Sequence, residues 1–129
     1  MYLLDTCVLL WLAGGARSSI SPAVIRTIQE NPEALFVSGI SGLEIGLKAG
    51  SGKLSLPVDA ATWFEQAVSH HGIHEIPVDG SLAARSTLLP PIHRDPCDRV
   101  IVATAIRHDL TVLTPDKLIS SYPGVKTLW

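Results

Sequence analysis

The sequence alternates short apolar runs with longer segments of helical periodicity, and this alternation constrains the fold most. The apolar runs are brief: "YLLD" at 2–5, "ALFVS" at 34–38, "HEIPV" at 74–78, "TVLT" at 111–114 and "VKTLW" at 125–129. Runs of this length predict buried strands. Strands that alternate with helices favour a parallel or mostly parallel sheet covered on both faces. We therefore predict an α/β fold, a three-layer α/β/α sandwich.

Local start and stop signals mark the helices expected between these strands. Ser21 before Pro22 is a strong N-terminal signal, and Asp59 opens an amphipathic segment that Gly72 ends. The stretch "LLPPIH" at 88–93 predicts a proline-stiffened loop. The predicted helices cover 7–13, 22–30, 40–50, 60–71, 79–89 and a segment that begins near Asp95.

Length and composition indicate one folded domain that spans residues 1–129. The chain has 47% hydrophobic residues, enough for a sizeable core, and no linker, repeat or low-complexity tract divides it. No basic segment precedes the apolar run after Met1, and Asp5 interrupts that run. The run is therefore typical neither of a signal peptide nor of a membrane span, and we expect a cytoplasmic protein without membrane association.

Cysteine content and charge limit the possible partners. The two cysteines, Cys7 and Cys97, are too few for a disulfide framework and lack metal-ligand spacing, so we expect reduced thiols. A net charge of −2 excludes a generally basic surface. Any nucleic acid would have to be held by a local patch, a metal ion or a groove between two copies.

Four acidic residues, far apart in the sequence, are expected at one edge of the sheet. Asp5 ends the first strand, Glu44 lies in the first turns after the second strand, and Asp116 follows the fourth strand. Asp98 starts the helix that leads into the fourth strand, and such a helix runs antiparallel to the strands. All four side chains therefore point to the carboxyl edge, where open α/β sheets form their sites.

A cluster of carboxylates needs a counter-charge. Two carboxylates about 4 Å apart repel by roughly 4 kcal/mol at an effective dielectric near 20. Some acids must be protonated, or a cation must lie among them. Oxygen ligands without histidine or thiolate favour a hard ion, Mg²⁺ or Mn²⁺. Such an ion commonly activates water and neutralises a phosphodiester in the transition state.

Each acid also has a structural explanation. Asp95 is a natural N-cap and Asp98, three residues later, suits the helix dipole. Asp5 could cap its own helix, Asp116 could be a turn residue, and Glu44 could lie on a solvated edge. Capping does not require that these positions share one rim, so the coincidence favours a site.

The motifs resemble those of the PIN-domain ribonucleases, and among them the VapC-type toxins of bacterial toxin–antitoxin modules. The resemblance covers the whole chain. Its most specific part is the pattern LPxxHxDPxDR followed by an apolar helix. The motifs are "LLDT" at 3–6, "SGLEIGLKAGSGKLSLP" at 41–57, "LLPPIHRDPCDRVIVATA" at 88–105, "LTPD" at 113–116 and the terminal "VKTLW".

The resemblance implies a metal-dependent hydrolysis of RNA at an acidic site. The catalytic residues would be Asp5, Glu44, Asp98 and Asp116. Asp5 and Asp98 would ligate Mg²⁺ or Mn²⁺ most directly and Asp116 would complete the metal ligands, while Glu44 would act through water. Asp95 would be mainly the helix cap, with an assisting role left open.

Further residues follow from the same resemblance. Thr6 and Thr114 are similar to hydroxyl residues beside the site, and Cys97 stands where this subgroup usually carries phenylalanine. The candidate phosphate contacts, which could equally be solvated surface residues, are Lys48, Lys53, Arg94, Arg99 and Lys117. For Arg99, an ion pair with Asp95 is the other explanation. His70, His71 and His74 suggest zinc, but Gly72 separates them, and a helix C-terminus suits histidines.

Partners are predicted from charge and from one apolar helix. Trp11, with Leu9, Leu10 and Leu12, makes its helix apolar on nearly every side, which suits core burial. The resemblance offers a second role, a surface for the antitoxin, since exposed apolar patches usually bind partners. Because one acidic copy offers RNA few basic residues, we expect a homodimer whose acidic rims face a shared groove.

Two other classes of protein would also place acids at this rim. A receiver or phosphatase-like domain is disfavoured, because "TCV" after Asp5 lacks a second nearby aspartate and no later strand ends in a clear catalytic lysine. A non-catalytic adaptor with a degenerate site is disfavoured because all four acids are present.

Overall fold

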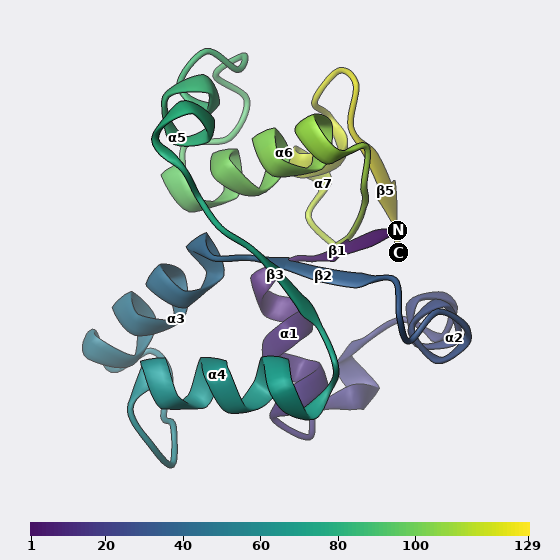
Figure 1. The fold of residues 1–129 in the computed structure, drawn as a ribbon, viewed down its shortest axis with the longest axis vertical. Helices are drawn as coiled ribbons and strands as arrows, with labels where there is room; N and C mark the ends of the chain where they lie inside the picture. The colour runs from purple at the N-terminus through teal and green to yellow at the C-terminus, as the bar shows by residue number, and fades with distance from the viewer.

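The computed structural model describes all 129 residues and contains a five-stranded, entirely parallel sheet with helices on both faces (Figure 1). The strands lie in the order β3-β2-β1-β4-β5. This arrangement confirms the predicted α/β sandwich. The strands are β1 (Tyr2–Leu4), β2 (Leu35–Ser38), β3 (His74–Ile76), β4 (Thr111–Leu113) and β5 (Lys126–Leu128).

Helices connect the strands close to where the sequence predicted them. Two short elements were not predicted: the 3₁₀ turn Arg17–Ser19 and the helix α7. The helix expected over 79–89 ends earlier, at Ser86. The helices are α1 (Thr6–Ala13), α2 (Pro22–Glu30), α3 (Ile40–Gly50), α4 (Ala60–His70), α5 (Gly80–Ser86), α6 (Pro96–His108) and α7 (Lys117–Ser120). None of these helices has the length and apolar character needed to span a bilayer.

Side-chain caps fix where six of the seven α-helices begin. In each case an oxygen of the residue before the helix accepts a backbone N–H of the first turn, which would otherwise lack a partner. The capping residues are Asp5, Ser21, Asp59, Asp79, Asp95 and Asp116. Two of these caps, Asp5 and Asp116, are acids that the sequence assigned to the candidate site, so capping and a role at the site occur in the same residues.

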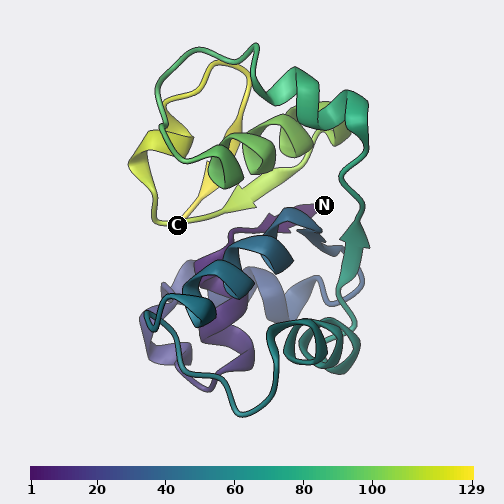
Figure 2. The same cartoon turned by 90° about the vertical axis from the view of Figure 1, so that its left-hand side faces the viewer.

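The sheet separates two apolar cores. Successive residues of a strand point to opposite faces, so Leu3 and Leu4 of β1 enter different cores. Leu4 packs with α1, α2 and α4, whereas Leu3 packs with α6 and α7. Figure 1 shows these two helical layers on either side of the sheet, and Figure 2 shows the same arrangement from the side.

The order of the strands determines where a site can form. From β1 the chain builds outward to β2 and β3, and from β4 it builds in the other direction to β5. The helices that follow β1 and β4 cover opposite faces, because α1 packs in one core and α7 in the other. In open α/β sheets, the crevice at such a switch point is the preferred place for ligands. Asp5 and Thr114 follow β1 and β4 directly.

Candidate active site

Asp5 bridges the switch point between β1 and β4. Its side chain is buried, with 5% of the residue exposed. Oδ1 accepts the N–H of Thr6 at 2.7 Å, and Oδ2 accepts the hydroxyl of Thr114 at 2.6 Å. Burial raises the pKa of Asp5, the hydrogen bonds from Thr114 and Thr6 oppose this rise, and the charges of Glu44 and Asp116 add to it. Each carboxylate oxygen keeps a second lone pair that can bind a ligand.

Asp98 is the centre of the acidic cluster. It lies in the first turn of α6 and is buried, yet it accepts no backbone N–H from that helix. Burial raises its pKa from 3.8 to about 7, and the charges of Asp5, Glu44 and Asp95 act in the same direction, whereas His93 opposes them. The ionised form is therefore unfavourable unless positive charge is supplied nearby.

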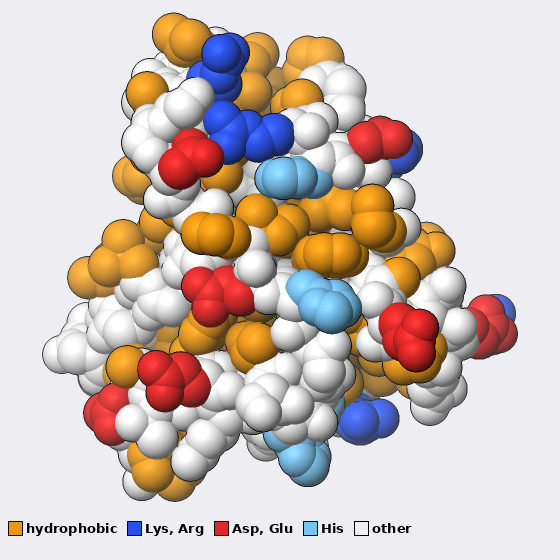
Figure 3. Space-filling model, in the orientation of Figure 1, with side chains coloured by type: hydrophobic (Ala, Val, Ile, Leu, Met, Phe, Trp, Pro, Cys, Tyr) orange, Lys and Arg blue, Asp and Glu red, His pale blue; other side chains and the backbone are white.

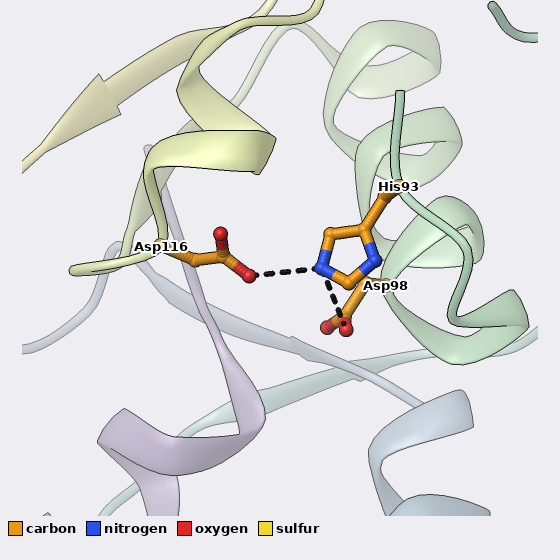
Figure 4. A group of neighbouring side chains, drawn as sticks. All are labelled: His93, Asp98 and Asp116. Carbon is orange, nitrogen blue, oxygen red and sulfur yellow. Dashed lines mark hydrogen bonds and ion pairs between the residues drawn. The ribbon is translucent and has the colours of Figure 1, made fainter. Parts of the chain in front are cut away.

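A histidine lies between two of the acids. Nε2 of His93 lies 2.9 Å from Oδ2 of Asp116 and 3.1 Å from Oδ2 of Asp98 (Figure 4). The Nε2 atom and one oxygen of each acid all lie within 4.8 Å of one another. Two carboxylates at that separation repel by roughly 3–4 kcal/mol at an effective dielectric of 20. A hydrogen-bond donor between them offsets part of this repulsion.

The other side of Asp98 is formed by Glu44 and Asp95. One carboxylate oxygen from each of these three residues lies within 4.8 Å of the other two. Glu44 Oε2 forms an ion pair with Lys48 at 3.4 Å, but Glu44 Oε1 is buried without any hydrogen-bond partner. A buried, unpartnered carboxylate oxygen is costly, so its presence in a cluster of acids calls for a ligand.

The donor set fits a hard divalent cation. Carboxylates from three elements converge on Asp98, and one of their oxygens is buried and unpartnered. Mg²⁺ and Mn²⁺ prefer such oxygen ligands. Asp5 belongs to neither group of closely spaced ligand atoms, although its charge raises the pKa of Asp98. The structure thus brings Asp98 close to Asp116 on one side and to Glu44 on the other, and Asp5 lies at the switch point outside both groups.

Hydroxyl groups connect the elements that carry these acids. Thr114 donates to the Asp5 carboxylate and accepts the backbone N–H of Asp116 at 3.0 Å, so one hydroxyl connects the Asp5 side chain to the backbone at Asp116. The hydroxyl of Thr6 lies 2.8 Å from that of Ser41, which joins α1 to α3 inside the protein. Sequence reasoning named Thr6 and Thr114 but missed Ser41.

The predicted phosphate contacts separate into two kinds. Lys48 and Lys53 line a groove of about 370 Å³ together with Glu44 and Asp95. Arg94 and Lys117 are exposed.

For Arg99, both earlier explanations are wrong. Its guanidinium forms no ion pair with Asp95, and it is not free for phosphate. It donates instead to the Tyr122 hydroxyl and to the backbone carbonyls of Ser86, Thr87, Leu89, Pro90 and His93.

The remaining histidines and the two cysteines belong to neither of these groups of ligand atoms, although Cys97, next to Asp98 in the chain, lines the groove with Glu44 and Asp95. His70 and His71 contact each other at the end of α4, with ring centroids 4.9 Å apart, and His74 packs against Phe36. Both cysteines are free thiols. Burial raises the pKa of Cys97 to about 11, and nearby carboxylates add to this shift, so Cys97 stays protonated at neutral pH. Burial likewise raises the pKa of Cys7.

Helix α1 is apolar toward both the core and the surface. Leu9 and Leu12 are buried in the core, whereas Leu10 and Trp11 are half-buried. Trp11 packs against Trp129 with ring centroids 6.0 Å apart. It also lines an apolar groove of about 500 Å³, formed by α1, the segment 54–57 and Trp63.

His93 is the residue of the candidate site that sequence reasoning left without a role. It belongs to the LPxxHxDPxDR pattern, and its position two residues before the cap Asp95 was the available signal. A single histidine in a loop carries no periodicity, so its place between two acids appears only in the structure.

Similarity to known proteins identifies the family. The sequence matches the PIN domain family over residues 2–125. The chain belongs to the PIN-domain family. This PIN domain is 31% identical to Ribonuclease VapC22 of Mycobacterium tuberculosis (strain ATCC 25618 / H37Rv), over 98% of this chain and 97% of the relative.

Solved structures share the PIN fold at lower identity. One is the DNA-bound VapBC from Salmonella typhimurium, with a TM-score of 0.71, 18% identity and coverage of 98% of this chain and 96% of that chain. Another is FitAcB from Neisseria gonorrhoeae, with a TM-score of 0.67, 23% identity and coverage of 100% and 97%.

Proposed function

We propose that this PIN-domain protein is a metal-dependent ribonuclease that hydrolyses RNA phosphodiester bonds and acts as the toxin of a toxin–antitoxin module. The observation that carries the proposal is the acidic cluster around Asp98, in which Glu44 Oε1 is buried without a partner. The relative named Ribonuclease VapC22 supports the choice of RNA as substrate.

The side chains can be assigned roles in this reaction. Asp5, Asp98 and Asp116 would hold Mg²⁺ or Mn²⁺, and Thr114 keeps the Asp5 carboxylate oriented and holds the backbone at Asp116. When bound, the ion would supply positive charge that activates water and neutralises the phosphodiester in the transition state. Glu44 has a free oxygen with which to orient or deprotonate the attacking water.

Lys48 and Lys53, which line the groove beside Glu44, would contact the RNA backbone. Arg94 and Lys117, which are also exposed, are further candidates for the same task.

The test compares Asp98, in the first turn of α6, with Asp95, the N-cap of the same helix, on one RNA substrate. Asp98→Asn removes charge from the centre of the cluster, and cleavage with Mg²⁺ or Mn²⁺ should fall by a factor on the order of 10³, equivalent to several kcal/mol of charge stabilisation. Asp95→Asn is the matched control, because asparagine caps a helix nearly as well and cleavage should stay within a few fold. A folded Asp98→Asn variant with full activity would exclude the assignment.

An antitoxin would bind the groove beside Trp11. This groove is apolar and half-buries a tryptophan, a residue that often dominates binding energy. Similar structures include a toxin–antitoxin complex from Klebsiella pneumoniae, with a TM-score of 0.64 and 24% identity, which supports a partner of this kind. Trp11→Ala should weaken antitoxin binding by more than 10-fold, equivalent to about 1.4 kcal/mol, and change the unfolding free energy less. Isothermal calorimetry and urea unfolding of the same variant measure both.

A homodimer would give RNA a larger groove. Basic side chains on the face in Figure 3 are few and are interspersed with acidic and apolar ones, so this face has no extended basic surface. Leu43 and Leu47 of α3 are 54% and 60% exposed, which suits an interface. Light scattering should then give about twice the monomer mass of 13.8 kDa. A toxin of this kind would act in the cytoplasm, where its RNA substrate lies.

A further inference from the structure

We infer that His93 is a positioning residue, which holds Asp98 and Asp116 in place for the metal through its Nε2–H and does not itself ligate the ion. This inference rests on the proposed function, because the role of His93 concerns the metal site assigned there. Nothing in the similarity to known proteins assigns a role to this histidine.

The hydrogen bonds around the ring define its tautomer. The backbone N–H of Asp95 points at Nδ1 of His93 at 3.1 Å, so Nδ1 must be the acceptor. A neutral imidazole has one acceptor nitrogen and one N–H. The hydrogen therefore lies on Nε2, which is the atom between the carboxylates of Asp98 and Asp116. With Nε2 protonated and Nδ1 already engaged, the ring has no lone pair free for a cation.

The ring is also anchored through its own backbone. The N–H of His93 donates to the Tyr122 hydroxyl at 2.8 Å, and its carbonyl accepts from Arg99 at 3.3 Å. The side chain is 12% exposed. Because backbone and ring are both held, His93 presents a fixed donor. Asp98 belongs to α6 and Asp116 precedes α7, so this donor fixes the spacing between two separate elements.

A fixed donor of this kind matters most for ligand geometry. Metal-binding carboxylates are themselves oriented by hydrogen bonds, and losing such a partner typically lowers metal affinity about 10–100-fold. Without the His93 ring, Asp98 and Asp116 repel across a gap, and nothing else in the structure bridges them. Removing the ring should therefore weaken metal binding, although no ligand atom is lost.

The tautomer is tested first, in metal-free protein. Long-range ¹H–¹⁵N NMR of the histidine rings reports which nitrogen carries the hydrogen, and His93→Ala assigns the signal. We expect hydrogen on Nε2 and none on Nδ1. A ring with its hydrogen on Nδ1 would overturn the inference, since Nε2 would then be free to ligate.

Metal affinity is tested with Mn²⁺ alone, by electron paramagnetic resonance titration of free ion. His93→Ala should bind Mn²⁺ about 10–100-fold more weakly than the wild type. His93→Gln should stay within about threefold of the wild type, because its amide N–H can occupy the position of Nε2–H. His74→Ala, which removes an exposed histidine of β3, is the control and should leave affinity unchanged. Circular dichroism in EDTA checks that each variant is folded.

The possible outcomes separate the inference from the proposed function. Wild-type affinity in His93→Ala, or an equal loss in both His93 variants, overturns the positioning role and leaves the ribonuclease proposal standing. Strong directly coordinated ¹⁴N modulation in the spin-echo spectrum of the Mn²⁺-loaded wild type would show that His93 is a ligand, which also overturns it. A wild-type protein that binds no Mn²⁺ rejects the metal site itself, and with it any role of His93 toward metal.

Discussion

The two sides of Asp98 differ in how their charges are satisfied. On the His93 side, Asp116 accepts hydrogen bonds at both oxygens, one from Leu118 N–H and one from His93. On the Glu44 side, one carboxylate oxygen is buried with no partner at all. We call these the satisfied half and the open half of the site. In the satisfied half, N–H groups of the protein pair with the carboxylate oxygens. In the open half, a carboxylate oxygen remains available for a ligand.

The two halves also differ in how the chain assembles them. The satisfied half is built mainly from residues 93–99, whose contacts with one another are short in sequence. The open half requires α3 to pack against α6, and the hydroxyl pair of Thr6 and Ser41 fixes α3 relative to α1. The satisfied half therefore combines one local motif with a single distant acid, Asp116, whereas the open half depends on the packing of two helices.

The largest expected effect comes from breaking the satisfied half at Arg99. Its guanidinium holds five carbonyls and the Tyr122 hydroxyl, and it fixes the loop that carries His93. Hydrogen bonds from a charged donor contribute about 1.5–3 kcal/mol each, and water replaces some of them. Arg99→Ala should lower the unfolding free energy by about 3 kcal/mol, as measured by urea denaturation.

Arg107→Ala provides the matched control for Arg99→Ala. Arg107 belongs to the same helix, but its ion pair with Asp79 lies at the surface, and such pairs contribute less than about 1 kcal/mol. Arg99→Lys should fall between the two variants, since lysine keeps the charge and loses the planar fork. Equal destabilisation by Arg99→Ala and Arg107→Ala would mean that the contacts of Arg99 add nothing to the satisfied half.

The sequence was sufficient for the layers of the fold because its signals there are periodic. Alternating strands and helices predicted the parallel sheet, and α3 was predicted with the observed bounds, Ile40–Gly50. Helix α7 has four residues, too few to show helical periodicity. The end of α5 was placed too late, because Arg99 takes the carbonyls of Ser86 and Thr87. That contact spans 12 or more residues and has no local signature.

At the site, the ends of the strands were sufficient to predict where the acids lie. The roles of His93 and Arg99 depend on hydrogen bonds between residues far apart in the sequence, which the sequence does not reveal. Asp5 and Asp116 lie at the carboxyl edge because they follow parallel strands. The role of His93 depends on the N–H of Asp95 and on a second acid 23 residues away. Arg99 was misassigned because its partners are backbone carbonyls, which every residue carries. The unpartnered oxygen of Glu44 is likewise a property of packing alone.

A smaller effect is expected at Asp98, which both halves share. Burial raises the pKa of Asp98 from 3.8 to about 7. In the unfolded chain this carboxyl loses its proton near pH 4, whereas in the folded protein it keeps the proton up to about pH 7. Stability attributable to Asp98 is therefore intact below pH 4, falls as the pH rises from 4 to 7, and stays low above that.

Asp98→Asn should remove this pH dependence in metal-free protein. At about 1.4 kcal/mol per tenfold change, ionising buried Asp98 costs at most about 4 kcal/mol. Part of the gain is offset, because a neutral amide attracts the Nε2–H of His93, 3.1 Å away, more weakly than a carboxylate does, so we expect a net stabilisation of about 1–2 kcal/mol at pH 8 and none at pH 4. Urea unfolding in EDTA across this range measures the difference.

Asp109→Asn is the control of opposite sign, because Lys126 lowers the pKa of this exposed acid. Saturating Mn²⁺ should reverse the order of Asp98→Asn and wild type, since the cation stabilises only the charged site. A constant difference between the two proteins from pH 4 to pH 8 would contradict this prediction. It would show that Asp98, the acid shared by the two halves, ionises as it does in the unfolded chain.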